Sequence, residues 1–139
     1  MEYIYLICPI TGILTCQILK CLLELIETKK FNFARLTNGS GGMPSSHTTF
    51  TTSITMLIGF KLGFTNPLFA ACFVFTCITA YDAMGLRYES GKHAEAINKL
   101  NKLNKVKDET LKQEIGHKPL EVLVGFIYGT LIAYLFSLI

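Results

Sequence analysis

Four apolar segments separated by two polar stretches constrain the fold of this 139-residue chain more than any other feature. The apolar segments span about residues 3–26, 47–64, 68–86 and 119–139, and the polar stretches span residues 27–46 and 87–118. About 20 apolar residues suffice for a helix to cross a bilayer. Hydrophobic residues make up 50% of the chain, and its mean hydropathy is +0.41, which is typical of a membrane protein. We therefore expect a single all-α membrane domain over residues 1–139, a bundle of four transmembrane helices with a polar helical segment between helices three and four.

The distribution of lysine and arginine predicts the orientation of this bundle. Of the 13 Lys and Arg residues, all but Lys20 and Lys61 lie in the two polar stretches. Short connections elsewhere put both stretches on one side of the membrane, and the positive-inside rule makes that side cytoplasmic. The helix ends next to these stretches consequently meet at one face. A nucleic-acid-binding protein would carry its bases on a folded soluble surface with stacking aromatic side chains, so we expect no nucleic acid as a partner.

The five cysteines predict neither a disulfide framework nor a metal site. Their number is odd, they form no C-x-x-C pair, and each lies in an apolar segment, where a reduced cysteine serves as a packing residue. They are Cys8, Cys16, Cys21, Cys72 and Cys77. The first apolar segment has no basic region before it and no small-residue cleavage site after it, so we expect it to be retained rather than removed as a secretory signal.

A glycine-rich loop precedes the second apolar segment, where residues 39–47 read GSGGMPSSH. The start of a helix has unpaired N–H groups and the positive end of the helix dipole, so glycines, hydroxyls and a histidine there favour an anion site. The same letters are also ordinary for a loop and helix start, with Ser45 or Ser46 as the N-cap. The loop therefore predicts either a phosphate site or a helix cap.

Other polar residues lie at the same predicted membrane face. His117 begins the fourth apolar segment, and Glu121 follows it by four residues, so a helix that includes both would put the carboxylate beside the imidazole. Asp82, in the last turn of the third segment, needs a partner or water, and Arg87 supplies either an ion pair or a further site residue. Lys20 either extends its ammonium group to the interface or reaches an anion at the membrane face. The third histidine of the chain, in the second polar stretch, is expected to be a solvated surface residue.

Two histidines, a helix start and several cations at one face predict phosphoryl transfer through a phosphohistidine. His117 would be the nucleophile, with Glu121 holding its other ring nitrogen and stabilising the charge that develops. His47 would protonate the leaving oxygen and later activate water. Hydroxyls, backbone N–H groups and cations would bind the phosphate oxygens. The candidate phosphate-binding residues are Ser45, Ser46, Gly42, Arg87, Lys92 and Lys20, with Asp82 in a supporting role.

This chemistry needs no metal and no other cofactor, and we expect vanadate to inhibit it by mimicking five-coordinate phosphorus. A rival interpretation places a metal ion among the histidines and carboxylates, which requires three convergent ligands. Their spacing matches no known metal motif. The candidate ligands would be His47, Asp82, His117 and Glu121.

Three blocks in order resemble a known family. Residues 41–47 (GGMPSSH), 81–87 (YDAMGLR) and 116–123 (GHKPLEVL) are similar to those of the small divergent membrane family related to the type-2 phosphatidic acid phosphatases and the vanadium-dependent haloperoxidases. In the larger superfamily, a Pro-Ser-Gly-His block supplies phosphate contacts and the acid histidine, and a later His-x-x-x-Asp pair supplies the nucleophile and its orienting carboxylate. The resemblance implies these roles for Ser45, His47 and His117, with Glu121 in place of the aspartate.

The chain departs from the superfamily pattern mainly in the anion clamp. Ser46 stands where the pattern has glycine, and the Ser-Arg of the third motif is absent before His117, so Arg87 is the nearest candidate. The superfamily's lysine seven residues before Arg-Pro is also missing, because Lys29 and Lys30 lie six and five residues before an arginine that leucine follows.

These observations predict a membrane phosphatase, a metal-independent phosphoric ester hydrolase that acts on a lipid phosphate or pyrophosphate at the cytoplasmic face. Its expected partner is the membrane lipid substrate, and self-association into a homo-oligomer stays open. The alternative is a non-catalytic membrane protein that binds a phospholipid or acts as a scaffold through residues 88–116. A haloperoxidase would need a soluble pocket that retains vanadate, which four short spans do not favour.

Overall fold

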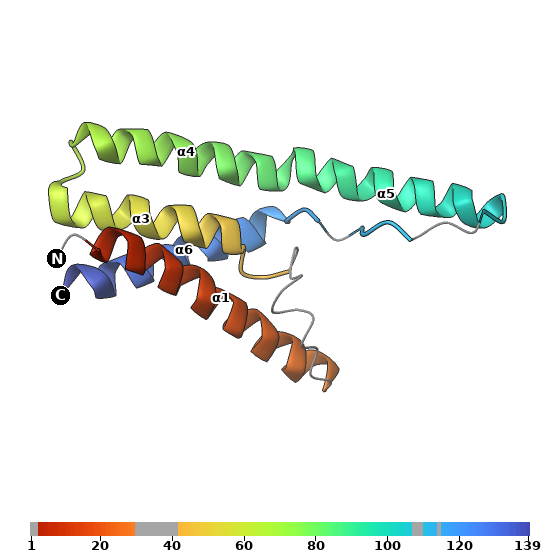
Figure 1. The fold of residues 1–139 in the computed structure, drawn as a ribbon, viewed down its shortest axis with the longest axis horizontal. Helices are drawn as coiled ribbons and strands as arrows, with labels where there is room; N and C mark the ends of the chain where they lie inside the picture. Colours follow the sequence, from red (N-terminus) through yellow and green to blue (C-terminus); the bar gives the residue numbers. More distant parts are fainter. Residues whose placement is uncertain (1–2, 30–41, 107–109, 114) are drawn as a thin grey trace.

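The computed structural model describes residues 3–29, 42–106, 110–113 and 115–139, and these residues form helices without any strand (Figure 1). The helices are α1 (Ile4–Thr28), α3 (Ser46–Leu62), α4 (Pro67–Met84), α5 (Leu86–Leu103) and α6 (Pro119–Ser137). The all-helical fold predicted from the apolar segments is therefore confirmed for the described residues. Lys30 and Arg35, which enter the comparison with the superfamily's first motif, lie outside them.

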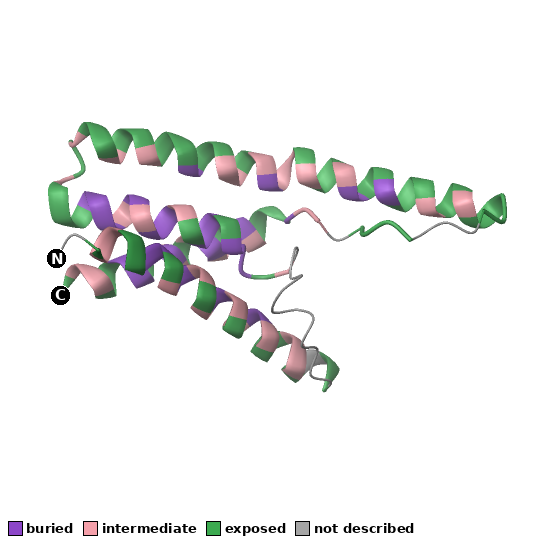
Figure 2. Ribbon diagram, in the orientation of Figure 1, coloured by how far each residue is buried: buried purple, intermediate pink, exposed green. Residues whose placement is uncertain are grey.

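Helix α3 is the central element of the bundle, since it packs against α1, α4 and α6. Helix α4 runs beside α3 and continues into α5, which projects beyond the bundle in nearly the same direction (Figure 1). The two helices meet at Gly85, whose φ of −97° and ψ of −92° interrupt the helical backbone. Buried residues concentrate on α3, whereas α4 and α5 are mostly exposed (Figure 2).

Local sequence explains where the helices of the bundle begin. The side chain of Ser45 accepts the N–H of Thr48 and caps α3, and the side chain of Asn66 accepts the N–H of Leu68 and caps α4. Proline occupies the first turn of both α4 and α6, where its missing N–H would have no intrahelical partner.

Small residues on α6 allow α3 to approach closely. A Cβ atom at Gly125 would lie 2.7 Å from the carbonyl oxygen of Ser45, and one at Gly129 would lie 2.7 Å from that of Thr49. Glycine at such positions lets two membrane helices pack backbone to backbone. The start of α3 is thereby held against the first half of α6.

Three helical stretches in the described residues are long and apolar enough to cross a membrane: Ile4–Ile26, Pro67–Leu103 and Pro119–Ser137. Helix α3 has 17 residues and is not among them. Of the four expected transmembrane helices, the structure therefore supports three as candidate spans. Helix α3 differs from them because hydroxyl-bearing residues fill its first half and the chain turns back soon after Leu62.

Candidate phosphate site at the start of α3

The two serines at the start of α3 are buried and use their hydroxyl groups within the fold. Ser45 Oγ accepts from the N–H and the hydroxyl of Thr48, at 3.4 and 3.0 Å, and the Ser45 N–H donates to the carbonyl of Glu121. Ser46 Oγ donates to Gln17 Oε1 at 3.3 Å. Of the two interpretations of this loop, the helix cap is the one that describes Ser45. Both serine hydroxyls already form hydrogen bonds within the fold, so neither is directly available as a phosphate ligand. Gly42 precedes them with a φ of 78°, which favours glycine.

His47 is exposed in the first turn of α3 and contacts the junction between α4 and α5. Its Nε2 lies 3.3 Å from Arg87 Nη1, and Arg87 Nε donates to Asp82 Oδ2 at 2.7 Å. A guanidinium has only donors, so Nε2 of His47 accepts and carries no proton in this arrangement. Asp82 and Arg87 thus form the ion pair that the sequence suggested and also reach the candidate site.

His117 is buried and held at both its backbone and its ring. Its N–H donates to the carbonyl of Ala83 at 3.0 Å, and its Nδ1 lies 2.8 Å from Glu121 Oε2. The same carboxylate oxygen accepts the N–H of Lys118 at 3.2 Å. An ionised Glu121 that accepts from Nδ1–H leaves the lone pair of Nε2 available, which is the tautomer that a histidine nucleophile requires.

The surroundings of His117 favour its neutral form. Burial lowers the pKa of His117 below its ordinary value of 6.5, and the positive charges of Lys20 and Arg87 lower it further. The hydrogen bond and the charge of Glu121 oppose this shift without cancelling it. The imidazole is therefore mostly unprotonated at neutral pH.

Lys20 is 3% exposed on α1, so its side chain does not extend into solvent. Its positive charge acts on both His47 and His117, as does that of Arg87. The role of Lys20 as a cation at the candidate site stays a prediction. The ion pair of Asp82 and Arg87 contacts His47 at one end of the bundle.

Lys92 lies on α5, and its ammonium group is engaged there. It pairs with Glu89 at 2.7 Å and lies 4.8 Å from the centre of the Tyr88 ring. The structure thus gives Lys92 partners on its own helix, and its role in phosphate binding stays a prediction. His93, on the same helix, is exposed.

Two α1 residues that sequence reasoning did not single out hold the start of α3 in place. Cys16 Sγ lies 3.7 Å from both the Pro44 carbonyl oxygen and Ser46 Oγ, and Gln17 accepts the hydroxyl of Ser46. A small polar residue inside an apolar segment carries no signal of such a contact. In the described part of the chain, no three His, Cys, Asp or Glu side chains gather closely enough to hold a metal ion.

Comparisons with known proteins place the chain among its relatives. The model of the divergent PAP2 family matches residues 1–132. The uncharacterized membrane protein YuiD of Bacillus subtilis is 31% identical over 142 residues, covering 91% of this chain and 89% of that protein. No solved structure matches. The membrane-protein relative and the three apolar helices indicate an integral membrane protein. The match also confirms the resemblance carried by the three sequence blocks, and the chain belongs to the divergent PAP2 family.

Proposed function

We propose that this protein hydrolyses a phosphate monoester or pyrophosphate of a membrane lipid through a phosphohistidine on His117. One observation carries the proposal: a buried imidazole, oriented by Glu121 at 2.8 Å, lies within the field of two cations that also act on a second histidine. The membership in a PAP2-related family supports the same reaction class.

In the first step, the lone pair of His117 Nε2 attacks phosphorus and a P–N bond forms. The bond from phosphorus to the leaving oxygen breaks, and that oxygen takes a proton from the protonated form of His47. Glu121 stabilises the positive charge that develops on the imidazole of His117. The leaving group is the lipid alcohol or, for a pyrophosphate, the lipid monophosphate.

In the second step, His47 removes a proton from water, and the resulting hydroxide attacks phosphorus. The P–N bond breaks, inorganic phosphate leaves, and His117 is regenerated. The contact between Arg87 and the unprotonated Nε2 of His47 corresponds to the base form that this step needs. A bound phosphate would draw Arg87 onto its own oxygens and allow His47 to take up the proton used in the first step.

The phosphate clamp in this proposal rests on cations and backbone rather than on serine hydroxyls. Lys20 and Arg87 supply the charge, and the N–H groups of Ser46 and His47 at the start of α3 supply further donors, whereas the Thr48 N–H donates to Ser45 Oγ. Ser45 and Ser46 hold this turn in place through their contacts with Thr48 and Gln17. The proposal therefore keeps both serines at the site but gives them a structural role.

A lipid substrate is favoured because exposed apolar side chains lie on the helices that carry candidate site residues. Leu86, Leu120 and Leu123 are each more than half exposed on the helices next to His117. We propose that α3 is the fourth membrane-embedded helix: its 17 residues span about 26 Å, close to the hydrocarbon thickness. The charge distribution supports a site at the cytoplasmic face.

Phosphate release by detergent-purified protein tests this function. We expect release from at least one member of a panel of lipid phosphates and lipid pyrophosphates, inhibited by vanadate and insensitive to a chelator. His117→Ala and His47→Ala should abolish release, whereas His93→Ala, at an exposed position, should not. Turnover that survives His117→Ala would refute the mechanism, and loss of activity with the chelator would favour a metal site.

A matched pair of variants tests the phosphate clamp. Lys20→Met should weaken inhibition by vanadate about tenfold or more, because a buried cation near the anion is lost. Lys61→Met, which removes an exposed lysine at the other end of α3, should leave inhibition unchanged. Equal effects of the two substitutions would contradict the proposed clamp.

A non-catalytic phospholipid-binding protein is the second candidate. The hydroxyls of Ser45 and Ser46 favour it, because both form hydrogen bonds within the fold, which departs from the superfamily's catalytic pattern. It predicts that vanadate or inorganic phosphate binds in a manner that depends on Arg87, with no release from any lipid in the panel. This outcome would replace the hydrolase proposal.

A further inference from the structure

The segment that leads to His117 is fastened to α5. We call residues 110–113 and 115–118 the strap. Asn98, on α5, bonds both polar groups of one strap residue: Leu111 N–H donates to Asn98 Oδ1 at 2.9 Å, and Asn98 Nδ2 donates to the Leu111 carbonyl at 2.8 Å. A side-chain amide used in this way fixes the register of the strap along the helix.

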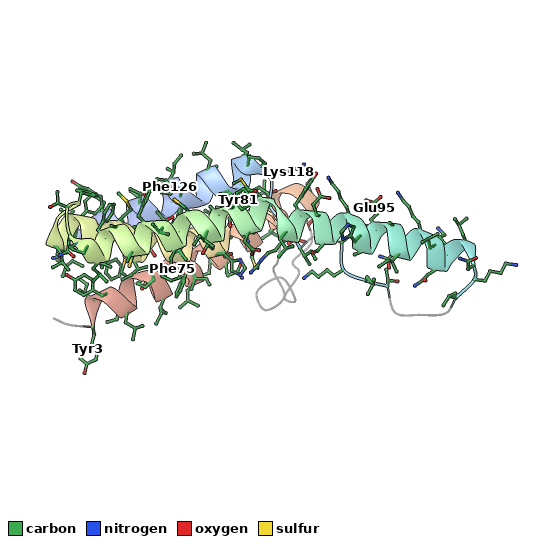
Figure 3. The ribbon with its side chains drawn as sticks, turned by 90° about the horizontal axis from the view of Figure 1, so that it is seen from above. Tyr3, Phe75, Tyr81, Glu95, Lys118 and Phe126 are labelled. Carbon is green, nitrogen blue, oxygen red and sulfur yellow. The ribbon has the colours of Figure 1, made fainter. Side chains whose placement is uncertain are left out.

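Two glycines let the strap lie directly on α5. A Cβ atom at Gly91 would be 2.3 Å from the carbonyl oxygen of Gln113, and a Cβ atom at Gly116 would be 2.3 Å from Tyr88 Cα. The contacts with α5 therefore occur in antiparallel order, from Asn98 through Gly91 to Tyr88. In Figure 3, Tyr81 and Lys118 lie near the end of the bundle from which α5 emerges, and Glu95 lies on the projecting part.

The last of these contacts lies one residue before the candidate nucleophile. Gly116 rests on Tyr88, and the N–H of His117 bonds the Ala83 carbonyl at the end of α4. The position of His117 is consequently set from two directions, by Glu121 on α6 and by the strap on α5. A shift of about 1 Å at a reacting group can cost two orders of magnitude in rate.

We propose that α5 and the strap form a positioning arm for His117, with Asn98 as the positioning residue that fixes the register of the strap. The structural part of this inference rests on the contacts alone, and its consequence for turnover rests on the proposed function. It assigns a role to the polar helix between α4 and α6 that the family resemblance does not address. The projecting part of α5 then acts on His117 through the strap.

The reactivity of His117 toward diethyl pyrocarbonate tests the arm without any substrate. Labelling of each histidine in the full-length protein is followed by mass spectrometry, with the exposed His93 as the internal reference. Asn98→Ala should raise the labelling rate of His117 severalfold, because the buried imidazole becomes accessible once the strap is loosened. Asn104→Ala removes an amide that donates to the Leu100 carbonyl of α5, and it should leave labelling unchanged.

Two further variants separate positioning from loss of fold. Asn98→Asp keeps the acceptor for Leu111 N–H and should give an intermediate labelling rate. Gly116→Ala places a methyl group against Tyr88 and should raise labelling of His117 even with Asn98 intact. His117 labelling that stays at the native level in both Asn98→Ala and Gly116→Ala would overturn the proposal.

Turnover provides a separate readout once a substrate is known. Asn98→Ala should lower kcat about tenfold or more with little change in KM, because the phosphate clamp on α1, α3 and Arg87 stays in place. A rise in KM at native kcat would overturn the positioning role. A native protein without turnover would refute the proposed function, whereas the labelling result would still decide whether the arm positions His117.

Discussion

At the residue scale, the pair formed by His117 and Glu121 determines what the candidate site can do. The carboxylate accepts from Nδ1 of the imidazole and from the N–H of Lys118, so it serves the site and the first turn of α6 at once. One side chain therefore couples the start of a helix to the tautomer of the nucleophile. A change to its charge should alter the chemistry before it alters the fold.

The substitution Glu121→Gln should lower the pKa of His117 further. Glu121 raises that pKa through its hydrogen bond and its charge, so removing the charge leaves burial and the cations Lys20 and Arg87 unopposed. A ring titration of His117 by NMR should give a midpoint below 6.5 in the native protein and a lower one in the variant. Turnover should fall on the order of 100-fold, because the charge on the attacking imidazole is no longer compensated.

The sign of this shift distinguishes an ionised Glu121 from a protonated one. A midpoint that rises in Glu121→Gln would mean that the carboxylate does not stabilise the imidazolium, which would contradict the assigned role. Gln keeps an oxygen that can accept from Nδ1, so the tautomer is preserved in the comparison. The exposed His93 supplies a reference titration in the same sample.

Sequence alone predicted much of the candidate site, and the reason differs from residue to residue. The spacing of four residues between His117 and Glu121 predicted their contact for a helix that includes both residues. The contact is present, but His117 precedes Lys118, the N-cap of α6, so the turn before the helix brings the imidazole to the carboxylate. Ser45 caps α3, as one of its two interpretations had it, whereas the role of Lys20 at the site stays a prediction. The partners of Lys92 on α5 were not predicted, because a position in a polar stretch does not indicate which face of α5 a side chain occupies.

At the element scale, the close contact between α3 and α6 sets the distance between the two halves of the site. The Ser45 N–H bonds the Glu121 carbonyl, and Gly125 allows this approach one turn further along α6. His47 lies in α3, and His117 immediately precedes Lys118, the N-cap of α6. The packing of the helices thus determines the separation of the proposed acid and nucleophile.

The substitution Gly125→Ala should therefore impair both stability and activity. Its Cβ would lie 2.7 Å from the Ser45 carbonyl, so α3 and α6 must move apart at a cost of about 1–3 kcal/mol. Thermal unfolding in detergent should show a lower midpoint, and phosphate release should fall. Leu131→Ala, at an exposed position further along the same helix, is the control. An unchanged midpoint in Gly125→Ala would indicate that the helices are less closely packed than the structure has them.

The positions of the helices were easier to predict than the continuation of α4 into α5. The apolar segments predicted elements close to α1, α3, α4 and α6. The alignment of α4 with α5 through Gly85 was not predicted, because a glycine at the end of an apolar run is equally typical of a helix end. The strap was also not foreseen, since its contacts with α5 depend on two glycines far apart in the sequence.

At the scale of the whole molecule, the site and the projecting helix lie at the end of the bundle opposite the chain termini (Figure 1). The connection between α3 and α4 lies at the end with the termini. The basic residues of the described chain are concentrated on the side of α5 and the strap. The positive-inside rule therefore predicts that α5 is cytoplasmic and that the α3–α4 connection faces the opposite side.

Labelling of single cysteines in intact cells tests this orientation. In a background with alanine at Cys21, Cys72 and Cys77, a cysteine introduced by His93→Cys on α5 should react with a membrane-impermeant maleimide only after the membrane is opened. One introduced by Thr65→Cys, between α3 and α4, should react from outside, because Thr65 and His93 lie on opposite sides of the bilayer if α4 spans it. Reaction of the His93→Cys protein from outside would place the site on the external face. Reaction of both from the same side would show that α4 does not cross the membrane, and with it the four-helix topology would fail.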